Sequence, residues 1–307
     1  KETVINSATF LAIENPSTDV ARYRAGDLDM TNYALPPEQF AKLQKELPGE
    51  VFTTRTLATY SYELNNKKAP FDNVNVRKAL NLSLDRNVIT DKVLGQGQTP
   101  TYVFTPTYIE EGQLIQQPAY SKEPMAQRNE EAIKLLEEAG YSKANPLKFS
   151  ILYNTNENHK KVAIAAASMW KANTKGLIDV KLENQEWKTY IDSRRAGRYD
   201  AARAGWNADY NQATTFGNYF LSNSSNNTAK YANPEYDKAI AESYVATDAE
   251  GRAKAYAKAE EILAKDFGIV PIFNYVNPRL VKPYVKGYSG KDPQDHIYLR
   301  NLYIIKH

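Results

Sequence analysis

Apolar and polar residues along the chain follow two periods, one typical of strands and the other of helices. Alternating or apolar runs at residues 147–153, 178–182 and 200–206 predict three strands. Between them, residues 158–174 and 188–195 repeat their apolar positions at the helical period. This alternation of strands and helices predicts a mixed α/β lobe in which helices pack on a sheet.

Two longer apolar runs, residues 51–64 and 269–276, bracket this region and are expected to be strands that pass between lobes. The helical period predicts further helices at residues 17–26, 36–47, 75–94, 123–139, 214–221, 234–245 and 248–266. Shorter strands are expected at residues 3–13, 27–31, 279–281, 284–288 and 302–305.

Composition narrows the class of protein. The chain has 307 residues, 42% hydrophobic and 24% charged, which predicts a globular protein with one or two cores. The net charge of +3 comes from basic residues scattered among acidic ones, which gives no indication of nucleic acid as a partner. The absence of cysteine excludes disulfides and thiol chemistry.

The sequence has no apolar run near the roughly 20 residues that a membrane helix needs, so we expect no membrane insertion. The opening residues Lys1, Glu2 and Thr3 do not begin a signal peptide, and an exported protein would have lost its signal.

The richest candidate chemistry lies in residues 184–211, which hold two of the three tryptophans, four arginines and three aspartates. Arg203 lies inside the strand predicted there, and Asp209 follows that strand in a turn-forming segment. A charge beside an indole at the end of a strand is typical of a ligand site. The alternatives are that Trp187 and Trp206 are core residues and that Asp209 caps a helix beginning near residue 211.

No pattern indicates an enzyme. The three histidines, His159, His296 and His307, are far apart in the sequence, and no nucleophile, phosphate-loop or zinc motif is present. We therefore expect no catalytic residue, no metal site and no cofactor. A glycan or peptidoglycan hydrolase, which needs only two carboxylates, remains the alternative of a different class.

Several segments resemble one known family. The segments NQEWKTYIDSR, ARAGWNADYN, LSNSSNNTAKY and RLVKPYVKGYSGKDP look like those of the periplasmic oligopeptide-binding proteins that serve bacterial ABC-type peptide permeases. Further matches extend the resemblance over essentially the whole chain. Members of that family are longer and have three lobes, so this chain resembles their C-terminal three-fifths, without the N-terminal part.

The resemblance implies an α/β fold of the periplasmic-binding-protein type II class, with mixed sheets and a ligand cleft between lobes joined by two hinge strands. Residues 58–276 would form the large C-terminal, peptide-binding lobe. Residues 1–57 and 277–307 would form part of a second lobe. The complete protein would be a monomer in the periplasm of a Gram-negative bacterium, binding short peptides and delivering them to membrane permease subunits for import.

A peptide has a cationic amino end, an anionic carboxylate and a row of amides, all of which need partners when the peptide is enclosed. The strand ARAGW offers backbone groups to an added peptide strand. Asp209 is the candidate for the ammonium group, and Arg203, Arg194 and His159 are candidates for the carboxylate. The alternative for His159 is a surface position at a helix start.

The resemblance adds further candidates, which line side-chain pockets or bring polar atoms and backbone to the cleft. These are Trp187, Trp206, Tyr275, Glu63, Asn154, Gly205 and Asn207. The chain departs from the general oligopeptide binders where Leu94 replaces a lysine, Asn207 a cysteine and Arg195 a histidine. Because Leu94 looks like the leucine of the relatives that bind murein tripeptide, that ligand is the alternative within the class.

Overall fold

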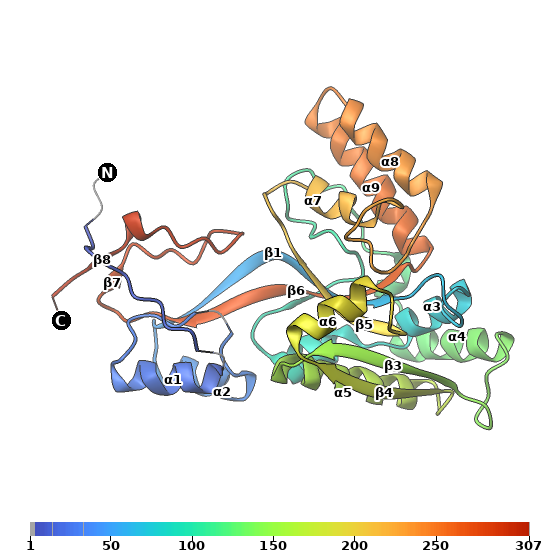
Figure 1. Ribbon diagram of the computed structural model, residues 1–307, viewed down its shortest axis with the longest axis horizontal. Helices are drawn as coiled ribbons and strands as arrows, with labels where there is room; N and C mark the ends of the chain where they lie inside the picture. Colours follow the sequence, from blue (N-terminus) through green and yellow to red (C-terminus); the bar gives the residue numbers. More distant parts are fainter. Residues whose placement is uncertain (1–3, 14, 33, 307) are drawn as a thin grey trace. The chain divides into compact units, whose positions relative to one another are not determined.

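The computed structural model describes residues 4–13, 15–32 and 34–306 (Figure 1). By its internal contacts the chain divides into two compact units. Unit 1 comprises residues 1–56, 90–98 and 275–307, and unit 2 comprises residues 57–89 and 99–274. The predicted lobe limits, 58–276 and 1–57 with 277–307, lie close to these boundaries, and their assignment to lobes of a longer protein stays a prediction.

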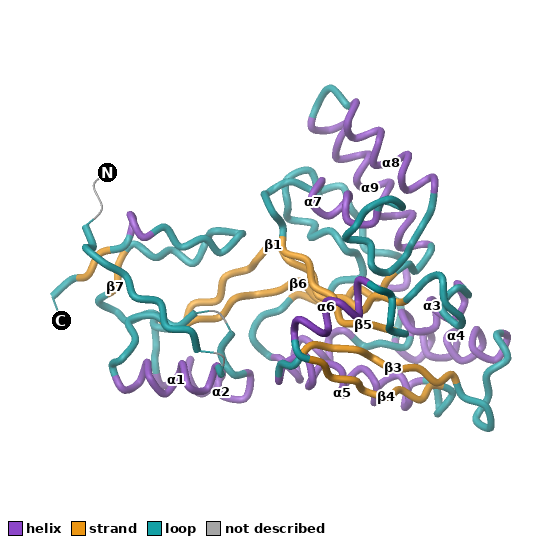
Figure 2. The backbone as a smooth tube through the Cα atoms, viewed as in Figure 1, coloured by secondary structure: helices purple, strands orange, loops and turns teal. Residues whose placement is uncertain are grey.

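One mixed sheet of six strands organises unit 2, in the order β2-β6-β1-β5-β3-β4. The strands are β1 (Val51–Leu64), β2 (Thr99–Pro100), β3 (Leu147–Asn154), β4 (Ile178–Gln185), β5 (Ala201–Asn207) and β6 (Ile269–Leu280). β5 pairs antiparallel with β1 and parallel with β3, so the strand pairing changes from antiparallel to parallel at β5. The predicted α/β class with a mixed sheet is confirmed. The two long strands β1 and β6, prominent in Figure 2, each continue from unit 2 into unit 1.

Within the described residues, unit 2 also contains seven α-helices, some of which pack on this sheet. They are α3 (Val74–Leu82), α4 (Met125–Glu138), α5 (Glu157–Asn173), α6 (Trp187–Arg195), α7 (Thr214–Gly217), α8 (Pro234–Val245) and α9 (Ala249–Lys265). Short turns of helix lie at Val88–Leu94, Ala119–Lys122 and Asn218–Phe220. α5 begins after Asn156, whose side chain accepts from the backbone N–H of Asn158 and His159, as expected for an N-cap.

α5 and α6 lie on opposite faces of β3 and β4 (Figure 1). On one face, Phe149 packs against Trp170 of α5, whose indole is fully buried and donates to the carbonyl of Leu80 at 2.9 Å. On the other face, Leu152 packs with Tyr190 of α6. The alternation of side chains along a strand separates these positions, as the sequence pattern predicted.

A larger apolar cluster of unit 2 lies beneath the pair α8–α9. Its members come from β1, the loop after β2, α7 and the short helix that follows it, the loop before α8, α8, α9 and the start of β6, and include Leu57, Phe104, Ile109, Phe216, Phe220, Tyr231, Tyr236, Ile240, Tyr256, Leu263 and Ile269. This cluster accounts for the apolar stripes that predicted the two helices at residues 234–245 and 248–266.

Unit 1 has a smaller core of its own. α1 (Pro16–Ala25) and α2 (Pro37–Glu46) contribute Val20, Tyr23, Phe40 and Leu43, and Leu35 and Leu280 complete the cluster. The C-terminal part adds β7 (Val285–Lys286), a short helical turn (Leu299–Asn301) and β8 (Tyr303–Ile304). There, buried Arg279 forms an ion pair with Asp295.

Three predicted elements are wrong. The strand expected at residues 27–31 is reduced to an isolated bridge between Met30 and Val281. The single helix expected at residues 75–94 ends at Leu82, because the carbonyls of Asn81 and Leu84 accept from the buried guanidinium of Arg86, at 3.0 and 3.3 Å, instead of continuing the helix. The strand expected at residues 3–13 is not formed over residues 4–13, where Val4 and Phe10 are exposed and no neighbouring strand pairs with the segment. An alternating sequence needs a partner strand for its backbone hydrogen bonds.

Candidate functional site

The strand β5 has one edge that is only partly paired. Its seven residues face β1 along their whole length, from Ala201 opposite Leu64 to Asn207 opposite Ala58. Its pairing with β3 ends after Ala202. In the part of the chain that the structure describes, no strand therefore pairs with residues 203–207 on the side away from β1.

The direction of the backbone groups on this edge follows from one hydrogen bond. The N–H of Ala208 donates to the carbonyl of Leu57 at 2.8 Å, so even-numbered positions of this segment turn their backbone groups toward β1. Odd-numbered positions turn theirs the other way, and the carbonyl of Arg203 there accepts from the hydroxyl of Tyr190. Gly205 and Asn207 thus present backbone donors and acceptors at the open edge.

Arg203 and His159 lie around the ring of Tyr60. The guanidinium carbon of Arg203 is 5.2 Å from the centre of that ring, and the imidazole of His159 is 5.6 Å from it. Burial lowers the pKa of His159 well below its ordinary value, and the positive charge of Arg203 lowers it further. An anion bound here would meet a permanent cation and a histidine that gains a proton more easily once a negative charge is present.

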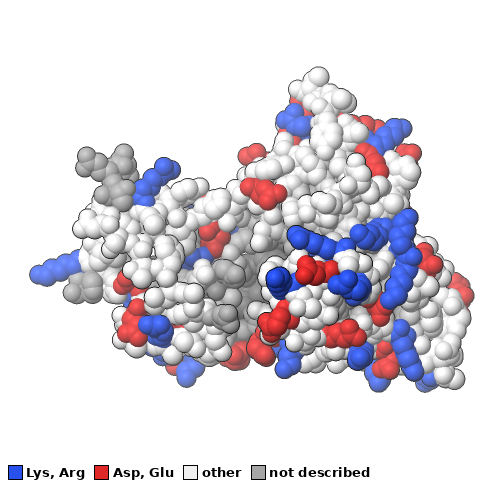
Figure 3. All heavy atoms as spheres, viewed as in Figure 1, with Lys and Arg blue, Asp and Glu red and all other residues white. Residues whose placement is uncertain are grey.

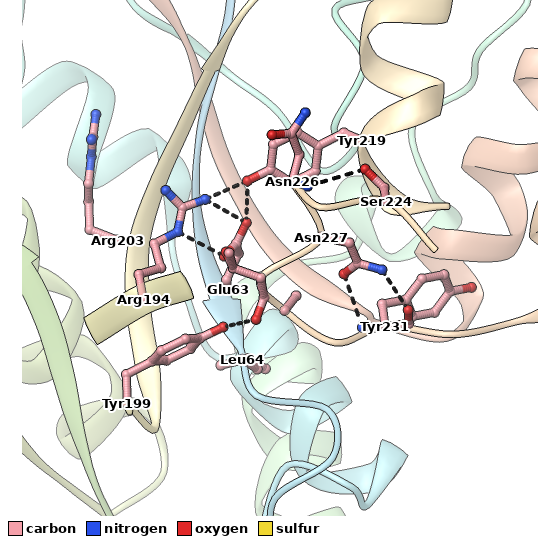
Figure 4. Close-up of polar contacts among 12 residues, drawn as sticks. Glu63, Leu64, Arg194, Tyr199, Arg203, Tyr219, Ser224, Asn226, Asn227 and Tyr231 are labelled. Atoms are coloured by element: carbon pink, nitrogen blue, oxygen red, sulfur yellow. Dashed lines mark hydrogen bonds and ion pairs between the residues drawn. The ribbon is translucent and has the colours of Figure 1, made fainter. Parts of the chain in front are cut away.

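The opposite face of the sheet carries a separate polar network around Glu63 (Figure 4). Arg194 of α6 donates to both carboxylate oxygens of Glu63, at 3.0 Å from Nε and 2.9 Å from Nη2. The hydroxyl of Tyr219 donates to Glu63 at 2.7 Å, and the hydroxyl of Thr228 donates to the other oxygen. Arg203 extends away from this network (Figure 4).

The two charged groups of this network are buried and hydrogen-bonded to each other. The side chain of Glu63 is 1% exposed and that of Arg194 is 11% exposed. Burial is the largest single influence and by itself lowers the pKa of Arg194, but Glu63, Tyr219 and Tyr190 together raise that pKa well above its usual value. Arg194 therefore already has a carboxylate partner in the protein, and its predicted contact with a ligand carboxylate stays a prediction.

Asp209 lies beyond the end of β5 and is exposed. Its backbone N–H donates to the hydroxyl of Thr215 at 3.2 Å, and its carboxylate accepts from that hydroxyl at 3.3 Å. The next helix, α7, begins at Thr214 with Ala213 at the N-cap. The alternative that Asp209 caps a helix near residue 211 is therefore wrong, because that helix starts three residues later.

The two tryptophans of this region differ in their surroundings. Trp206 is half-buried, packs edge-on against Tyr219 at 4.9 Å and donates to Thr215 at 3.3 Å. Trp187, at the start of α6, is 58% exposed and stacks on Tyr190 at 5.8 Å. The core alternative thus fits Trp206 in part and does not fit Trp187.

Two further candidates lie apart from β5. Asn154 ends β3, opposite Gln185 of β4, and is half-buried. Tyr275 belongs to unit 1, where its carbonyl accepts from the hydroxyl of Thr56 at 3.2 Å. Its predicted place beside the other candidates, all of which lie in unit 2, stays a prediction.

Some residues of the site were not found from the sequence. Tyr60, Tyr219 and Thr228 complete the surroundings of Arg203 and Glu63, yet they lie outside residues 184–211. The only signal was that Tyr60 falls in a long β-rich segment and Thr228 in a segment that carries the family resemblance. The contacts themselves follow from the register of β1 against β5 and from the loop after α7.

Comparison with known proteins decides the family. A family model described as bacterial extracellular solute-binding proteins, family 5 Middle, matches residues 1–228. The chain belongs to this family. It is 96% identical over 307 residues to the periplasmic oligopeptide-binding protein OppA of Haemophilus influenzae. It is 44% identical over 306 residues to the periplasmic murein peptide-binding protein MppA of Escherichia coli.

A solved structure of this family matches the fold. The crystal structure of Haemophilus influenzae OppA in complex with RPPGFSPFR superposes with a TM-score of 0.93 at 95% identity, over 99% of this chain and 59% of that one. The expected periplasmic-binding-protein fold of the α/β class is thereby confirmed. The chain spans 57% and 56% of the lengths of the two curated family members, so it corresponds to a little over half of each.

Two further features concern the described residues, 4–13, 15–32 and 34–306. None of the helices there is both long and apolar enough to cross a membrane. Within the same residues, no group of three or more histidines, aspartates or glutamates is placed to hold a metal ion.

Proposed function

We propose that the complete protein containing this chain binds short peptides in the periplasm and delivers them to an ABC-type permease for import. The observation that carries this proposal is the open edge of β5 at residues 203–207, together with the polar groups at its two ends. A peptide that adds to this edge as a further strand is held by its main chain, which is common to all sequences.

Each part of a short peptide finds a partner along this edge. The backbone groups of Gly205 and Asn207 pair with the peptide main chain. The carboxylate lies at Arg203 and His159, and the ammonium group at Asp209. The four residue steps of β5 from Arg203 to Asn207 span about 13 Å at the usual rise of a strand. An extended peptide of three or four residues spans roughly 10–14 Å, so its two charged ends match the two ends of the edge.

The remaining candidates serve the peptide side chains in this proposal. Trp206 and the exposed Trp187 offer apolar walls. The partly exposed guanidinium of Arg194 is proposed to meet a polar side chain through water, and Glu63 to hold that guanidinium in place. Asn154 and Tyr275 are proposed as further pocket-lining residues.

The comparisons support this reading over its alternatives. The relative named for oligopeptide binding is 96% identical, whereas the relative named for murein peptide binding is 44% identical. Membership of a solute-binding family favours a binding protein over the hydrolase considered from the sequence. The names of these relatives also support the periplasm as the location. The permease subunits are the partners that such a delivery requires.

Backbone-modified peptides test the proposed pairing. We expect the complete protein to bind a tripeptide, and the same tripeptide with a methylated central amide nitrogen to bind about 5- to 150-fold more weakly. The reason is that one enclosed carbonyl of β5 loses its donor, at a cost of about 1–3 kcal/mol. Titration calorimetry measures both affinities.

A matched control uses a peptide methylated on a side-chain nitrogen, which leaves the main chain intact and should bind like the parent. Equal affinity for the main-chain-methylated and parent peptides would contradict pairing along β5. Native mass spectrometry of the purified protein adds a separate check. A set of peptides that differ in sequence supports binding through the main chain, whereas a single muropeptide would favour the murein alternative.

A further inference from the structure

A group of exposed basic side chains lies at the other end of β5 from Asn207. Three segments, residues 65–68, 197–200 and 228–230, meet there through hydrogen bonds. The N–H of Asn65 donates to the carbonyl of Asp200 at 3.1 Å, and its side-chain amide donates to the carbonyl of Gly197 at 3.2 Å. The N–H of Asn66 donates to the carbonyl of Ala229 at 2.9 Å.

These segments carry four exposed cations, which together we call the basic surface: Lys67, Lys68, Arg198 and Lys230. Figure 3 shows Lys and Arg side chains gathered over the part of unit 2 that holds α6 and β5. The alkyl chain of Lys230 reaches to 4.0 Å from the position that a Cβ atom would take at Gly197. The hydrogen bonds between the segments thus bring charges that are far apart in sequence onto one small area.

The charge of this area is poorly balanced. Asp200 is the one carboxylate within the three segments, and it already binds Lys68 at 2.6 Å and the N–H of Ser150 at 3.0 Å. Among the described ion pairs, none involves Lys67, Arg198 or Lys230. Four cations and one carboxylate give +3, which equals the net charge of the whole chain, so the two signs cancel in the rest of it.

The basic surface is separate from the proposed peptide site. Arg198 comes before β5, whereas the proposed peptide contacts begin at Arg203 and continue to Asp209. Each of the three segments is held by hydrogen bonds to its neighbours, so the backbone positions that carry these side chains are set before a partner binds. Such preorganisation lowers the cost of ordering an interface.

We propose that the basic surface is the docking surface for an acidic protein face, namely the side of the permease that receives the peptide. This proposal rests on the proposed function, because delivery to a permease requires a surface that the permease contacts. Positive charges concentrated on one area attract a complementary negative area over distances near the Debye length, which speeds correct encounter more than it adds affinity.

The test compares two triple variants of the complete protein with equal change of charge. The first, Lys67→Glu, Arg198→Glu and Lys230→Glu, reverses the unpaired charges of the basic surface. The second, Lys143→Glu, Lys175→Glu and Lys238→Glu, reverses exposed lysines elsewhere in unit 2 that take part in none of the described ion pairs. Association with the permease in lipid nanodiscs is followed by biolayer interferometry at low and at physiological salt.

We expect the first variant to associate about tenfold or more slowly at low salt, with a smaller difference at high salt. The second variant should stay within about twofold of the parent. Equal slowing in both variants would overturn the proposal, as would unchanged association of the first variant. The proposal would also be overturned if the first variant associated more slowly than the parent with nanodiscs that lack permease, and by the same factor, because lipid would then be the partner.

A separate measurement distinguishes failure of this proposal from failure of the proposed function. Tripeptide affinity is measured by calorimetry for the parent and for both variants, and circular dichroism checks that they are folded. Unchanged peptide affinity with slowed docking supports both proposals. Peptide binding and docking by the parent, with equally fast docking by the first variant, overturns only the docking surface. A parent that binds no peptide overturns the function.

Discussion

At the scale of single residues, the proposed site joins groups of opposite charge at the two ends of one strand edge. Arg203 and His159 lie around Tyr60 at one end, and Asp209 follows the other end. Arg203 lies on the opposite face of the sheet from the Glu63–Arg194 pair. The role of each group can therefore be changed and measured separately.

The first prediction concerns the ammonium group of the peptide. Asp209→Asn keeps the shape of the side chain and removes its charge. If the bound peptide encloses this carboxylate, the loss should be about 3 kcal/mol, or roughly two decades in dissociation constant, because one charge stays enclosed without its partner. Calorimetry with a free tripeptide measures the loss.

The control for this prediction is the N-acetylated tripeptide, which lacks the ammonium group and should bind the parent and the Asp209→Asn variant equally. An ion pair that stays open to solvent contributes about 1 kcal/mol or less. A loss of affinity below about fivefold would therefore show that Asp209 does not hold an enclosed ammonium group.

The second prediction concerns pH and His159. An unfolded histidine has a pKa of about 6.5, and the pKa of folded His159 is lower. Between these two values the unfolded state binds more protons, so the free energy of unfolding falls as the pH drops below about 6.5. His159→Gln should weaken this dependence by up to about 1.4 kcal/mol per pH unit. Urea unfolding of the ligand-free protein at pH 7.5 and 5.5 compares the two slopes, and equal slopes contradict the prediction.

At the scale of elements, the buried ion pair Glu63–Arg194 connects α6 to β1. Removing one charge of a buried pair leaves the other without its partner. Glu63→Gln should therefore lower the free energy of unfolding by about 3–5 kcal/mol. Urea unfolding measures the change.

Two further variants make this third prediction specific. The double variant Glu63→Gln, Arg194→Met removes both charges and should be more stable than the single variant. In contrast, Glu242→Gln in the exposed pair with Lys258 should cost about 0.5 kcal/mol or less. A Glu63→Gln variant as stable as the parent would mean that the pair does not hold α6 in place.

The elements of unit 2 were largely predictable because their apolar positions repeat within a single segment. α8 at residues 234–245, β1 at residues 51–64 and the region of α6 and β5 were all predicted within one or two residues. The helix expected at residues 75–94 was not, because Arg86 ends it through contacts with Thr101 and Pro271, which no local pattern reveals.

The candidate site was predictable in part for the same reason. Residues 184–211 gather on one helix and one strand that follow each other, so their clustering was visible in the sequence. The separation of Arg203 from Arg194 was not visible. It depends on the register that places Arg203 opposite Tyr62 and Glu63 opposite Ala202, and thus on opposite faces of the sheet.

At the scale of the whole molecule, the two units have separate cores and should respond separately to core mutations. Leu43 lies in the core of unit 1 and Ile240 in the large cluster of unit 2. Leu43→Ala should remove about 2–5 kcal/mol of packing. We expect faster amide exchange in residues 16–46 and little change in residues 234–265, as measured by hydrogen exchange with mass spectrometry.

The matched variant Ile240→Ala should reverse this pattern, with faster exchange in residues 234–265 and little change in residues 16–46. Faster exchange across both units in either variant would show that the two cores unfold together, contrary to the fourth prediction.

The open edge of β5 also bears on aggregation. The backbone groups that Gly205 and Asn207 present at this edge offer any extended chain a template, and a second copy of the protein can use it as readily as a peptide can. Charges beside a strand edge oppose such growth, because an added strand would have to remove them from water. Arg203 and Asp209 would thus oppose aggregation of the ligand-free protein, in addition to their proposed role in holding ligand. Neutralising them should make the ligand-free protein prone to fibre formation, from which bound peptide would protect it.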